Sequence, residues 1–404
     1  MPAFPTLDDL PPGQCVLVRL DLNAPVENRR VQDTRRFERH ARTVRELAAA
    51  GHRVVCLAHQ GRPGGDDFLS LSQHADILAG HVGRPVGFVP DTVGEDAVSA
   101  IRGLESGDIV LLENVRTCEG ELPEEPPEQK ADTEFVRTLA GEVDAYVNDA
   151  YSAAHRSHAS LVGFPLVLPA YAGRVMATEY AANTAIAQRT FDGPVTMVVG
   201  GTKATDVIDV MANLHETVDR FLLGGVAGQL FLRAAGHPVG FDTDPARDLF
   251  DSQWTHNRAA IESMLADHGD QLSLPVDMAY DGDGERAERA LDDIETSETA
   301  YLDIGTDTAQ RYAAAVRDSE AVFLKGALGV FEDERFSTGT VEVLAAMAET
   351  DCFSVVGGGD TSRAIEMYGM READFGHVSI AGGAYIRALT GDELVGVDVL
   401  TGAT

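Results

Sequence analysis

Short apolar runs alternate with amphipathic stretches along the whole chain, and few folds accommodate that pattern. Runs such as 54–58 and 195–199 are apolar and rich in β-branched residues, as buried strands are. Stretches such as 36–50 and 175–188 place apolar residues at helical spacing. Because strands that alternate with helices form parallel β–α units, we predict an α/β fold with doubly wound, Rossmann-like parallel sheets.

A break in this alternation divides the chain. Its 404 residues exceed the length of one typical domain. Pro165, Pro169 and Gly173 interrupt the pattern, and the alternation then starts again. We therefore predict two domains, 1–172 and 173–389.

The charge of the chain is strongly negative. Asp and Glu number 65 against 32 Lys and Arg, a net charge of −33. Nucleic acids and acidic membranes require a basic face, so neither is expected as a partner. No run has membrane-spanning length and the N-terminus has no signal pattern, so we expect a cytoplasmic protein. An acid-rich, lysine-poor composition is typical of a protein from a salt-rich cytoplasm. At 1 M salt the Debye length falls to about 3 Å, so the repulsion between the acidic side chains is screened. The alternative is an acidic protein from a cytoplasm of ordinary salt concentration.

Polar side chains follow the predicted strands of the first half. They are Asp21, Asn23, His59, Arg62, Arg116 and Arg156. Because the carboxyl ends of parallel strands meet at one edge, these side chains are expected to lie together. Three arginines there, in a chain short of positive charge, indicate a phosphate or carboxylate ligand. Structural salt bridges are the alternative, since acids are abundant.

In the second half, a strand at 352–356 runs into Gly357-Gly358-Gly359 and then Asp360-Thr361. A glycine turn followed by a helix start is an anion site, because free N–H groups and the positive end of the helix dipole point at the ligand. A carboxylate beside a bound phosphate would hold Mg²⁺. The alternative is a tight β–α turn that binds nothing.

Glycines also follow three other predicted strands of this half. These strand ends are Gly200-Gly201-Thr202-Lys203, Gly224-Gly225 and Lys325-Gly326. Strand ends that carry glycine, two of them with lysine, are suited to binding a polyphosphate and a ribose. The segment 223–228 only approaches the dinucleotide fingerprint and no Walker A loop is present, which disfavours a nicotinamide-dependent dehydrogenase.

Two acidic stretches are not predicted as sites. Residues 119–130 are rich in Glu and Pro and are expected to form a solvated loop. Residues 281–285 resemble a calcium loop, but Arg286 stands where an EF-hand requires glycine, so a surface loop is expected.

Together these residues match a known family. The chain resembles phosphoglycerate kinase nearly from end to end, in a form expected of a halophilic archaeon. The motifs that carry the resemblance are Val18-Arg19-Leu20-Asp21-Leu22-Asn23, Asp33-Thr34-Arg35-Arg36-Phe37, His59-Gln60-Gly61-Arg62-Pro63, Leu111-Leu112-Glu113-Asn114-Val115-Arg116, 146–160, Gly200-Gly201-Thr202-Lys203, Gly329-Val330-Phe331-Glu332 and 357–361.

The resemblance implies a reversible glycolytic and gluconeogenic kinase. It would transfer a phosphoryl group between 1,3-bisphosphoglycerate and ADP, giving 3-phosphoglycerate and ATP, with Mg²⁺ bound to the nucleotide. It also implies domains facing a cleft, a helical hinge that closes near 172–179, and a tail, 390–404, packed on the first domain. We expect a monomer with small-molecule substrates as its only partners.

The resemblance also implies roles for particular residues. Arg36 and Lys203 would stabilise the transferred group as catalytic residues. The phosphoglycerate would be bound by Asp21, Asn23, Arg36, His59, Gln60, Gly61, Arg62, Arg116 and Arg156. The nucleotide would be bound by Lys203, Lys325, Glu332, Gly357, Gly358, Gly359, Asp360 and Thr361, with the metal at Asp360.

Some positions depart from the family pattern. Val207 stands where the family usually has a second lysine, and Lys325 stands in a turn that is usually Asn-Gly-Pro. We hypothesise that both positions face the nucleotide and that Lys325 replaces the missing charge. Ile380-Ala381-Gly382-Gly383 stands where the family has a Thr-Gly-Gly-Gly turn, so one side-chain donor is lost and phosphate support there would depend on backbone N–H groups. A catalytically silent nucleotide-binding module is the alternative function, although Arg36 and Lys203 are both retained.

Overall fold

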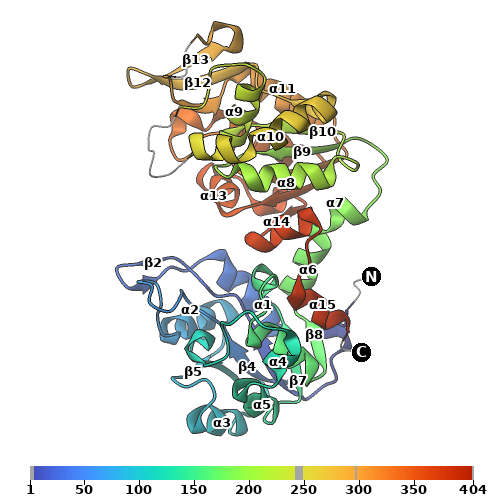
Figure 1. The fold of residues 1–404 in the computed structure, drawn as a ribbon. Helices are drawn as coiled ribbons and strands as arrows, with labels where there is room; N and C mark the ends of the chain where they lie inside the picture. Colours follow the sequence, from blue (N-terminus) through green and yellow to red (C-terminus); the bar gives the residue numbers. More distant parts are fainter. Residues whose placement is uncertain (1–3, 242–248, 296–297, 403–404) are drawn as a thin grey trace. The chain divides into compact units, whose positions relative to one another are not determined.

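The computed structural model describes residues 4–241, 249–295 and 298–402. The chain separates into two compact units (Figure 1), Met1–Ala181 together with Glu393–Thr404, and Ala182–Asp392. The sequence pattern places the boundary at 172/173, whereas this division falls within helix α6 (Arg174–Asn183).

The first unit is built on a parallel sheet with strand order β5-β6-β4-β1-β7-β8. Its strands are β1 (Cys15–Arg19), β4 (Arg53–Leu57), β5 (Gly87–Val89), β6 (Ile109–Leu112), β7 (Ala145–Asn148) and β8 (Ala170–Ala172). Its helices include α1 (Arg35–Ala49), α2 (Ser72–Val82), α3 (Glu95–Arg102), α4 (Pro127–Ala131) and α5 (Glu134–Ala140). All five residues of β1 are buried, as expected for a central parallel strand covered on both faces.

Helix α1 shows how the sequence pattern produces the packing. Phe37, Ala41, Val44 and Ala48 form the predicted stripe, and all four are buried in the core of the first unit. They pack with Val18 of β1, whose register partner on β4 is Cys56. The apolar stripe thus seats α1 on the sheet.

The second unit repeats the plan, with strand order β11-β10-β9-β15-β16-β17. The strands are β9 (Val195–Val199), β10 (Arg220–Leu223), β11 (Leu272–Ser273), β15 (Ala321–Lys325), β16 (Phe353–Gly357) and β17 (His377–Val378). The helices are α7 (Ala185–Gln188), α8 (Ala204–Leu214), α9 (Gly225–Ala234), α10 (Asp251–His268), α11 (Thr306–Arg317), α12 (Thr338–Ala348), α13 (Gly359–Met367) and α14 (Gly383–Thr390). The two parallel sheets confirm the predicted α/β fold class.

Two features of the second half differ from the sequence expectation. The helix expected over 175–188 is interrupted at Thr184, which separates α6 from α7. A small antiparallel sheet, with order β13-β12-β14, was not expected; its strands are β12 (Asp277–Gly282), β13 (Glu285–Ala290) and β14 (Tyr301–Ile304). The acidic stretch 281–285 lies at the tip of the β12–β13 hairpin, where Asp283 and Gly284 form the exposed turn.

The last helix, α15 (Val395–Thr401), belongs to the first unit, where it lies beside β8 (Figure 1). The Gly396 amide donates to the Ala154 carbonyl at 2.7 Å, and Asn148 Nδ2 donates to the Gly396 carbonyl at 3.2 Å. Val395 and Val399 pack on an apolar cluster of that unit. These contacts attach the tail to the strand-end loops after β7.

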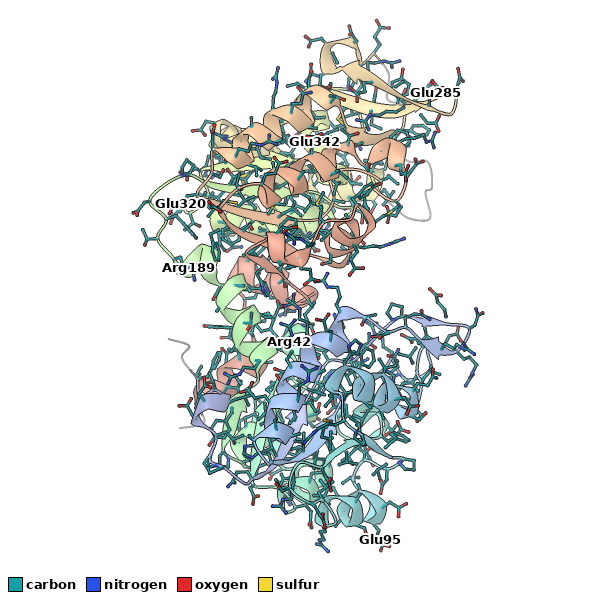
Figure 2. All side chains as sticks on the ribbon, turned by 180° about the vertical axis from the view of Figure 1, so that it is seen from behind. Arg42, Glu95, Arg189, Glu285, Glu320 and Glu342 are labelled. Carbon is teal, nitrogen blue, oxygen red and sulfur yellow. The ribbon has the colours of Figure 1, made fainter. Side chains whose placement is uncertain are left out.

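Many acidic side chains lie on the surface. Glu95, Glu285 and Glu342, labelled in Figure 2, are exposed. Within the described ranges, no helix has the length and apolar character needed to cross a membrane.

Candidate active site

The polar residues that follow the strands of the first unit gather at one edge of its sheet. Strand β1 lies between β4 and β7, and β6 lies beyond β4, so the segments after these four strands are neighbours. Buried here are Asp21, His59, Gln60, Asn114, Arg116, Asn148 and Asp149. Four of these, Asp21, His59, Gln60 and Arg116, are among the residues that the sequence selects for the phosphoglycerate.

Asp21 and Arg36 form the centre of this group. The Asp21 carboxylate accepts hydrogen bonds from Arg36 Nη1 and from the Ser152 hydroxyl, and Arg36 Nη1 also contacts Ser152 Oγ at 3.0 Å. Burial opposes ionisation of Asp21, but the adjacent Arg36 guanidinium, the nearby histidines and the Ser152 hydrogen bond together outweigh it and lower the pKa of the carboxyl group. Asp21 is thus a buried anion that holds Arg36 in place.

His59 is fixed as a neutral hydrogen-bond donor. Arg19 Nη2 lies 3.1 Å from His59 Nδ1, and because a guanidinium can only donate, Nδ1 must accept and the ring proton must sit on Nε2. Burial lowers the pKa of His59 well below its usual value, and the nearby cations Arg19 and Arg116 act in the same direction. Its Nε2–H group is the donor that the imidazole offers to a ligand.

A chain of hydrogen bonds joins the remaining strand-end loops. Asn23 Oδ1 accepts from the Gly61 amide at 2.8 Å, and the Gly61 carbonyl accepts from Arg116 Nη1. Gly61 has φ +65°, and a Cβ there would lie 2.4 Å from the Asp67 carbonyl oxygen, so the position requires glycine. Burial lowers the pKa of Arg116 to about 10, with Arg19 and Arg156 adding to the effect.

Two of the selected residues lie differently from the others. Arg62 is exposed. Gln60 is fully buried: its amide nitrogen donates to the Ala24 and Asp67 carbonyls, and its oxygen accepts from the Ala24 amide and from His74 Nε2. Gln60 is therefore placed to support the loop rather than to meet a ligand.

The sequence interpretation missed a buried layer beneath these residues. Arg19 is only 1% exposed and donates through Nε to Ser160 Oγ at 2.8 Å. Ser160 donates in turn to Glu121 Oε1 at 2.7 Å, and the Ser160 amide donates to Oε2 at 2.7 Å. A charged residue inside the apolar run Val16-Leu17-Val18-Arg19-Leu20 is the signal that could have identified Arg19.

The expectation that 119–130 is a solvated loop is wrong. Glu121 and Lys130 are fully buried, and 127–131 forms helix α4. Lys130 Nζ donates to the Gly120 carbonyl at 2.5 Å and lies 3.2 Å from Glu125 Oε2. Glu121 is directed inward at Ser160, whereas Glu119, Glu124 and Glu128 are exposed, so composition alone could not reveal which carboxylate has a role in the interior.

In the second unit, glycines at adjacent strand ends bring three loops into backbone contact. A Cβ on Gly200 would lie 2.2 Å from the Ala327 carbonyl oxygen, and one on Gly326 would lie 2.5 Å from the Gly200 carbonyl oxygen. Gly225, at φ +59°, would meet the Gly201 backbone at 2.7 Å. These glycines are required by the close approach of β9, β10 and β15 at their carboxyl ends.

The turn after β16 has the geometry expected for an anion site. Gly358 has φ +111° and precedes α13, whose first residues are Gly359 and Asp360. Thr361 is buried, and its hydroxyl donates to the Gly357 and Gly358 carbonyls, each at 2.9 Å. The threonine thus closes the turn at the start of α13, and the backbone amides of a helix start are common donors to a bound anion.

The two predicted lysines lie close together at the start of α8. Lys203 is exposed and precedes the helix, while Lys325 is mostly buried at the end of β15, with Nζ 3.7 Å from Asp206 Oδ2. Burial lowers the pKa of Lys325, Asp206 opposes this, and Lys203 adds to it. Val207 is fully buried in the core, so the expectation that it faces the nucleotide is wrong.

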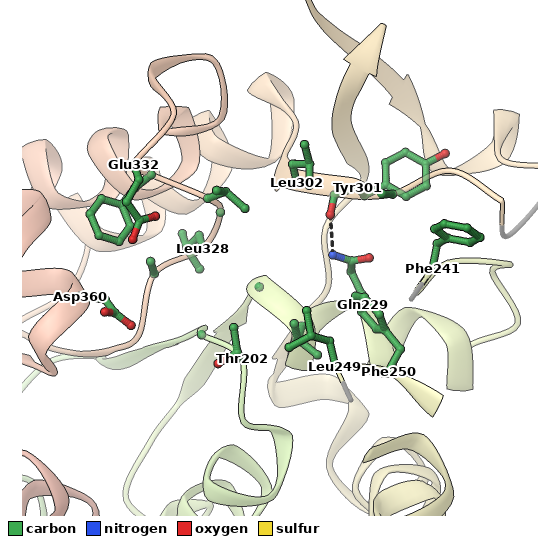
Figure 3. A pocket seen from close by; sticks show the side chains of 18 residues that line it. Thr202, Gln229, Phe241, Leu249, Phe250, Tyr301, Leu302, Leu328, Glu332 and Asp360 are labelled. Carbon is green, nitrogen blue, oxygen red and sulfur yellow. Dashed lines mark hydrogen bonds between the residues drawn. The ribbon is translucent and has the colours of Figure 1, made fainter. Parts of the chain in front are cut away.

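A pocket of about 470 Å³ lies at this edge of the second sheet (Figure 3). Its walls include Gly201, Gly225, the segment 327–332 and Asp360. Glu332 and Asp360 therefore border the same cavity, as the sequence interpretation requires. Glu332 Oε1 also lies 3.5 Å from Arg363 Nη1, which places it at the rim.

Asp360 is an exposed carboxylate in the first turn of α13, directly after the glycine turn. Among the described residues, no group of three or more His, Cys, Asp or Glu side chains surrounds a common point. Mg²⁺ in kinase sites is held by one or two carboxylates, substrate phosphates and waters, so a single exposed aspartate at the anion turn fits that donor set.

Comparison with known proteins gives a consistent result. The family model for phosphoglycerate kinase matches residues 7–392. Phosphoglycerate kinases from the halophilic archaea Halorubrum lacusprofundi and Haloarcula marismortui are 70% and 69% identical, covering 100% and 98% of this chain and 99% of each relative. The crystal structure of the enzyme from Pyrococcus horikoshii OT3 has a TM-score of 0.90 at 31% identity, with 99% of both chains covered.

The similarity extends to a bacterial structure, phosphoglycerate kinase from Coxiella burnetii, at a TM-score of 0.82 and 30% identity over 99% of both chains. The resemblance and the halophilic setting predicted from the sequence are confirmed by these relatives. On the strength of the family match and of these near full-length relatives, the chain belongs to the phosphoglycerate kinase family.

Proposed function

We propose that the cluster around Asp21 and Arg36 binds 3-phosphoglycerate or 1,3-bisphosphoglycerate, and that the pocket ending at Asp360 binds ADP or ATP. Family membership makes the chain a phosphotransferase that moves a phosphoryl group reversibly between 1,3-bisphosphoglycerate and ADP. The assignment of each ligand to a unit is our inference from the residues below.

The density of positive charge at the first site carries this proposal. Arg19, Arg36 and Arg116 gather there with Arg156 in a chain of net charge −33. Burial lowers the pKa of Arg116, and Arg19 and Arg156 are close enough to lower it further. Asp21 and Glu121 offset part of this charge. An anionic ligand with a carboxylate and a phosphate would supply the rest of the negative charge that balances these arginines, and both groups suit the fork geometry of arginine.

The reaction requires little covalent chemistry from the protein. The carboxylate of 3-phosphoglycerate is itself the nucleophile, and catalysis of phosphoryl transfer consists mainly of positioning and charge stabilisation. Arg36, held by Asp21 and Ser152, would stabilise the oxygens of the transferred group. Lys203 would do the same from the nucleotide side.

In the second unit, the nucleotide phosphates would lie over the start of α13, at Gly358 to Thr361, with Lys203 and Lys325 beside them and Glu332 near the ribose. Asp360 would hold Mg²⁺ together with the phosphates and water. Bound there, Mg²⁺ neutralises phosphate charge.

Coupled phosphoglycerate kinase activity in molar KCl and in dilute buffer tests the proposal. Arg36→Ala is compared with Arg42→Ala, a control on the same helix whose exposed side chain (labelled in Figure 2) lies 3.3 Å from Glu38. We expect wild-type activity, greatest at high salt, to persist in Arg42→Ala and to fall about 1,000-fold in Arg36→Ala.

Other outcomes would change the proposal. Equal activity in Arg36→Ala and wild type would remove Arg36 from the site. Absence of activity at both salt concentrations, with nucleotide binding intact, would instead favour a silent nucleotide-binding module.

A further inference from the structure

The pocket of the second unit has two chemically different ends (Figure 3). Glu332 and Asp360 border one end, and Phe241, Phe250 and Tyr301 border the other. A nucleoside diphosphate has the same polarity, with charged phosphates at one end and a flat, largely apolar base at the other. Provided that the proposed nucleotide site is right, the base belongs at the aromatic end.

Gln229 lies at that aromatic end, and the nitrogen of its side-chain amide is already hydrogen-bonded within the protein. It projects from α9, lines the pocket and is 5% exposed. Its Nε2 donates to the Tyr301 carbonyl at 3.0 Å (Figure 3). Because a carbonyl oxygen can only accept, the nitrogen must face Tyr301, and this contact fixes the orientation of the amide.

The other half of the amide has no partner. Gln229 Oε1 is buried and accepts no hydrogen bond from any residue that the structure describes. A buried acceptor without a donor costs free energy, and buried polar groups in native proteins are usually satisfied. The oxygen belongs to a pocket-lining residue at the end assigned to the base, so a ligand donor is the partner that its position suits.

We propose that Gln229 Oε1 accepts a hydrogen bond from the exocyclic 6-amino group of adenine and thereby selects adenine over 6-oxopurines. Adenine presents an N–H donor at position 6. Hypoxanthine presents a carbonyl oxygen there, which would place two acceptors against each other. The flat faces of the two bases offer the aromatic side chains the same kind of apolar contact, so the discrimination at position 6 is assigned to this one oxygen.

Nucleotide discrimination in wild type and Gln229→Met tests the inference. Methionine keeps the length and apolar stem of the side chain but has only a weak acceptor. We expect wild type to bind Mg-ADP about tenfold more tightly than Mg-IDP, and the variant to reduce this ratio to about one, because one hydrogen bond is worth up to about a factor of ten. The ratio compares two ligands on one sample, so partial loss of folded protein cancels.

A matched control separates recognition from support of the backbone. Gln253→Met removes another amide of this unit, which accepts from the Ala204 amide at 2.7 Å and donates to the Thr202 carbonyl at 2.9 Å. We expect this variant to weaken both nucleotides equally and to leave the ratio unchanged. A purely structural role for Gln229 would produce the same result in Gln229→Met.

The outcomes distinguish failure of the inference from failure of the proposed function. If wild type binds ADP and the ADP-to-IDP ratio is unchanged in Gln229→Met, the role of Gln229 is wrong and the nucleotide site stands. If folded wild type binds neither nucleotide, both the role of Gln229 and the proposed nucleotide site are wrong. A measurement on wild type alone tests the inference even if the variant fails to fold. Purine riboside diphosphate, which carries only hydrogen at position 6, should bind more weakly than ADP and more tightly than IDP. Any other order of affinities contradicts the inference.

Discussion

The candidate site of the first unit is made of buried, paired charges, whereas that of the second is made mainly of backbone and exposed side chains. Asp21 and Arg116 are less than a tenth exposed and bond protein groups. Lys203 and Asp360 are exposed beside glycine turns. The charged side chains of the first site are therefore held in place by protein contacts before a ligand binds. The second site offers a ligand mainly backbone amides and a shaped pocket.

This difference predicts different consequences of mutation. Charges that form part of an interior contribute to folding as well as to binding, because removal of one partner leaves another buried charge uncompensated. Exposed charges beside a glycine turn contribute chiefly to affinity. Substitutions in the first site should therefore change both stability and activity, and those in the second mainly the KM for nucleotide.

The largest expected effect is on stability, from Arg19→Met. This change leaves Glu121 and Ser160 buried without their cation, so the free energy of unfolding should fall by about 3–5 kcal/mol. Urea unfolding in molar KCl measures it, with Arg42→Met on α1 as the exposed control. A loss below about 1 kcal/mol would show that the buried layer does not depend on this charge.

The second prediction concerns pH and has opposite signs in the two units. Burial lowers the pKa of His74, in the first unit, to about 4. The folded state then binds fewer protons than the unfolded state between about pH 4 and 6.5, so the contribution of His74 to stability is complete above about 6.5 and is lost as pH falls. Over the whole window this contribution amounts to about 3 kcal/mol.

Asp303, in the second unit, behaves in the opposite way. Burial raises its pKa to about 6, although the Gly339 amide and Arg286 oppose the shift. The folded state then binds more protons than the unfolded state between about pH 3.8 and 6, so this contribution declines as pH rises through 6. The free energy of unfolding of His74→Gln and of Asp303→Asn is measured at pH 4.5, 5.5 and 7. Its slope against pH should differ from that of wild type in opposite directions in the two variants. Equal slopes in both variants and wild type would contradict the prediction. Trp254, the sole tryptophan, reports the second unit by fluorescence.

The third prediction tests the nucleotide side. Lys325→Ala should raise the KM for ADP about tenfold, equivalent to about 1.4 kcal/mol, because it removes an ammonium group beside Lys203. The KM for 3-phosphoglycerate should not change. Steady-state kinetics measure both, with Lys203→Ala as the stronger comparator; a KM for ADP that hardly moves would rule out charge replacement by Lys325.

The smallest effect is expected from exposed ion pairs. Arg258 Nε lies 2.7 Å from Glu262 Oε1 on α10, and both side chains are exposed. Arg258→Ala should change the free energy of unfolding by less than about 0.5 kcal/mol, since such pairs are screened by salt. A loss comparable with that of Arg19→Met would remove the contrast between interior and surface charge.

The parallel strands were predictable because they are buried on both faces and read as continuous apolar runs. The run 145–148 and the run 195–199 coincide with β7 and β9. Short edge strands such as β5 and β17 lack this signal. The hairpin β12–β13 was missed because half of its strand residues are charged and its turn resembles a surface loop.

The candidate sites were predictable where a residue follows a strand and not where it lies within one. Asp21, His59 and Arg116 were selected by their place after apolar runs. Arg19 and Glu121 were missed because their function depends on tertiary contacts with residues far away in the sequence. Gln229, on the inner face of a helix, gives no sequence signal that separates it from an ordinary buried glutamine.

Hydrogen exchange with each ligand added alone is the most direct test of the division of labour between the units. We predict that 3-phosphoglycerate slows exchange in 21–23, 59–62 and 114–116 of the first unit, and that Mg-ADP slows exchange in 200–203, 326–332 and 357–361 of the second. Protection of the second unit by 3-phosphoglycerate alone, or of the first by Mg-ADP alone, would contradict the assignment of the two sites.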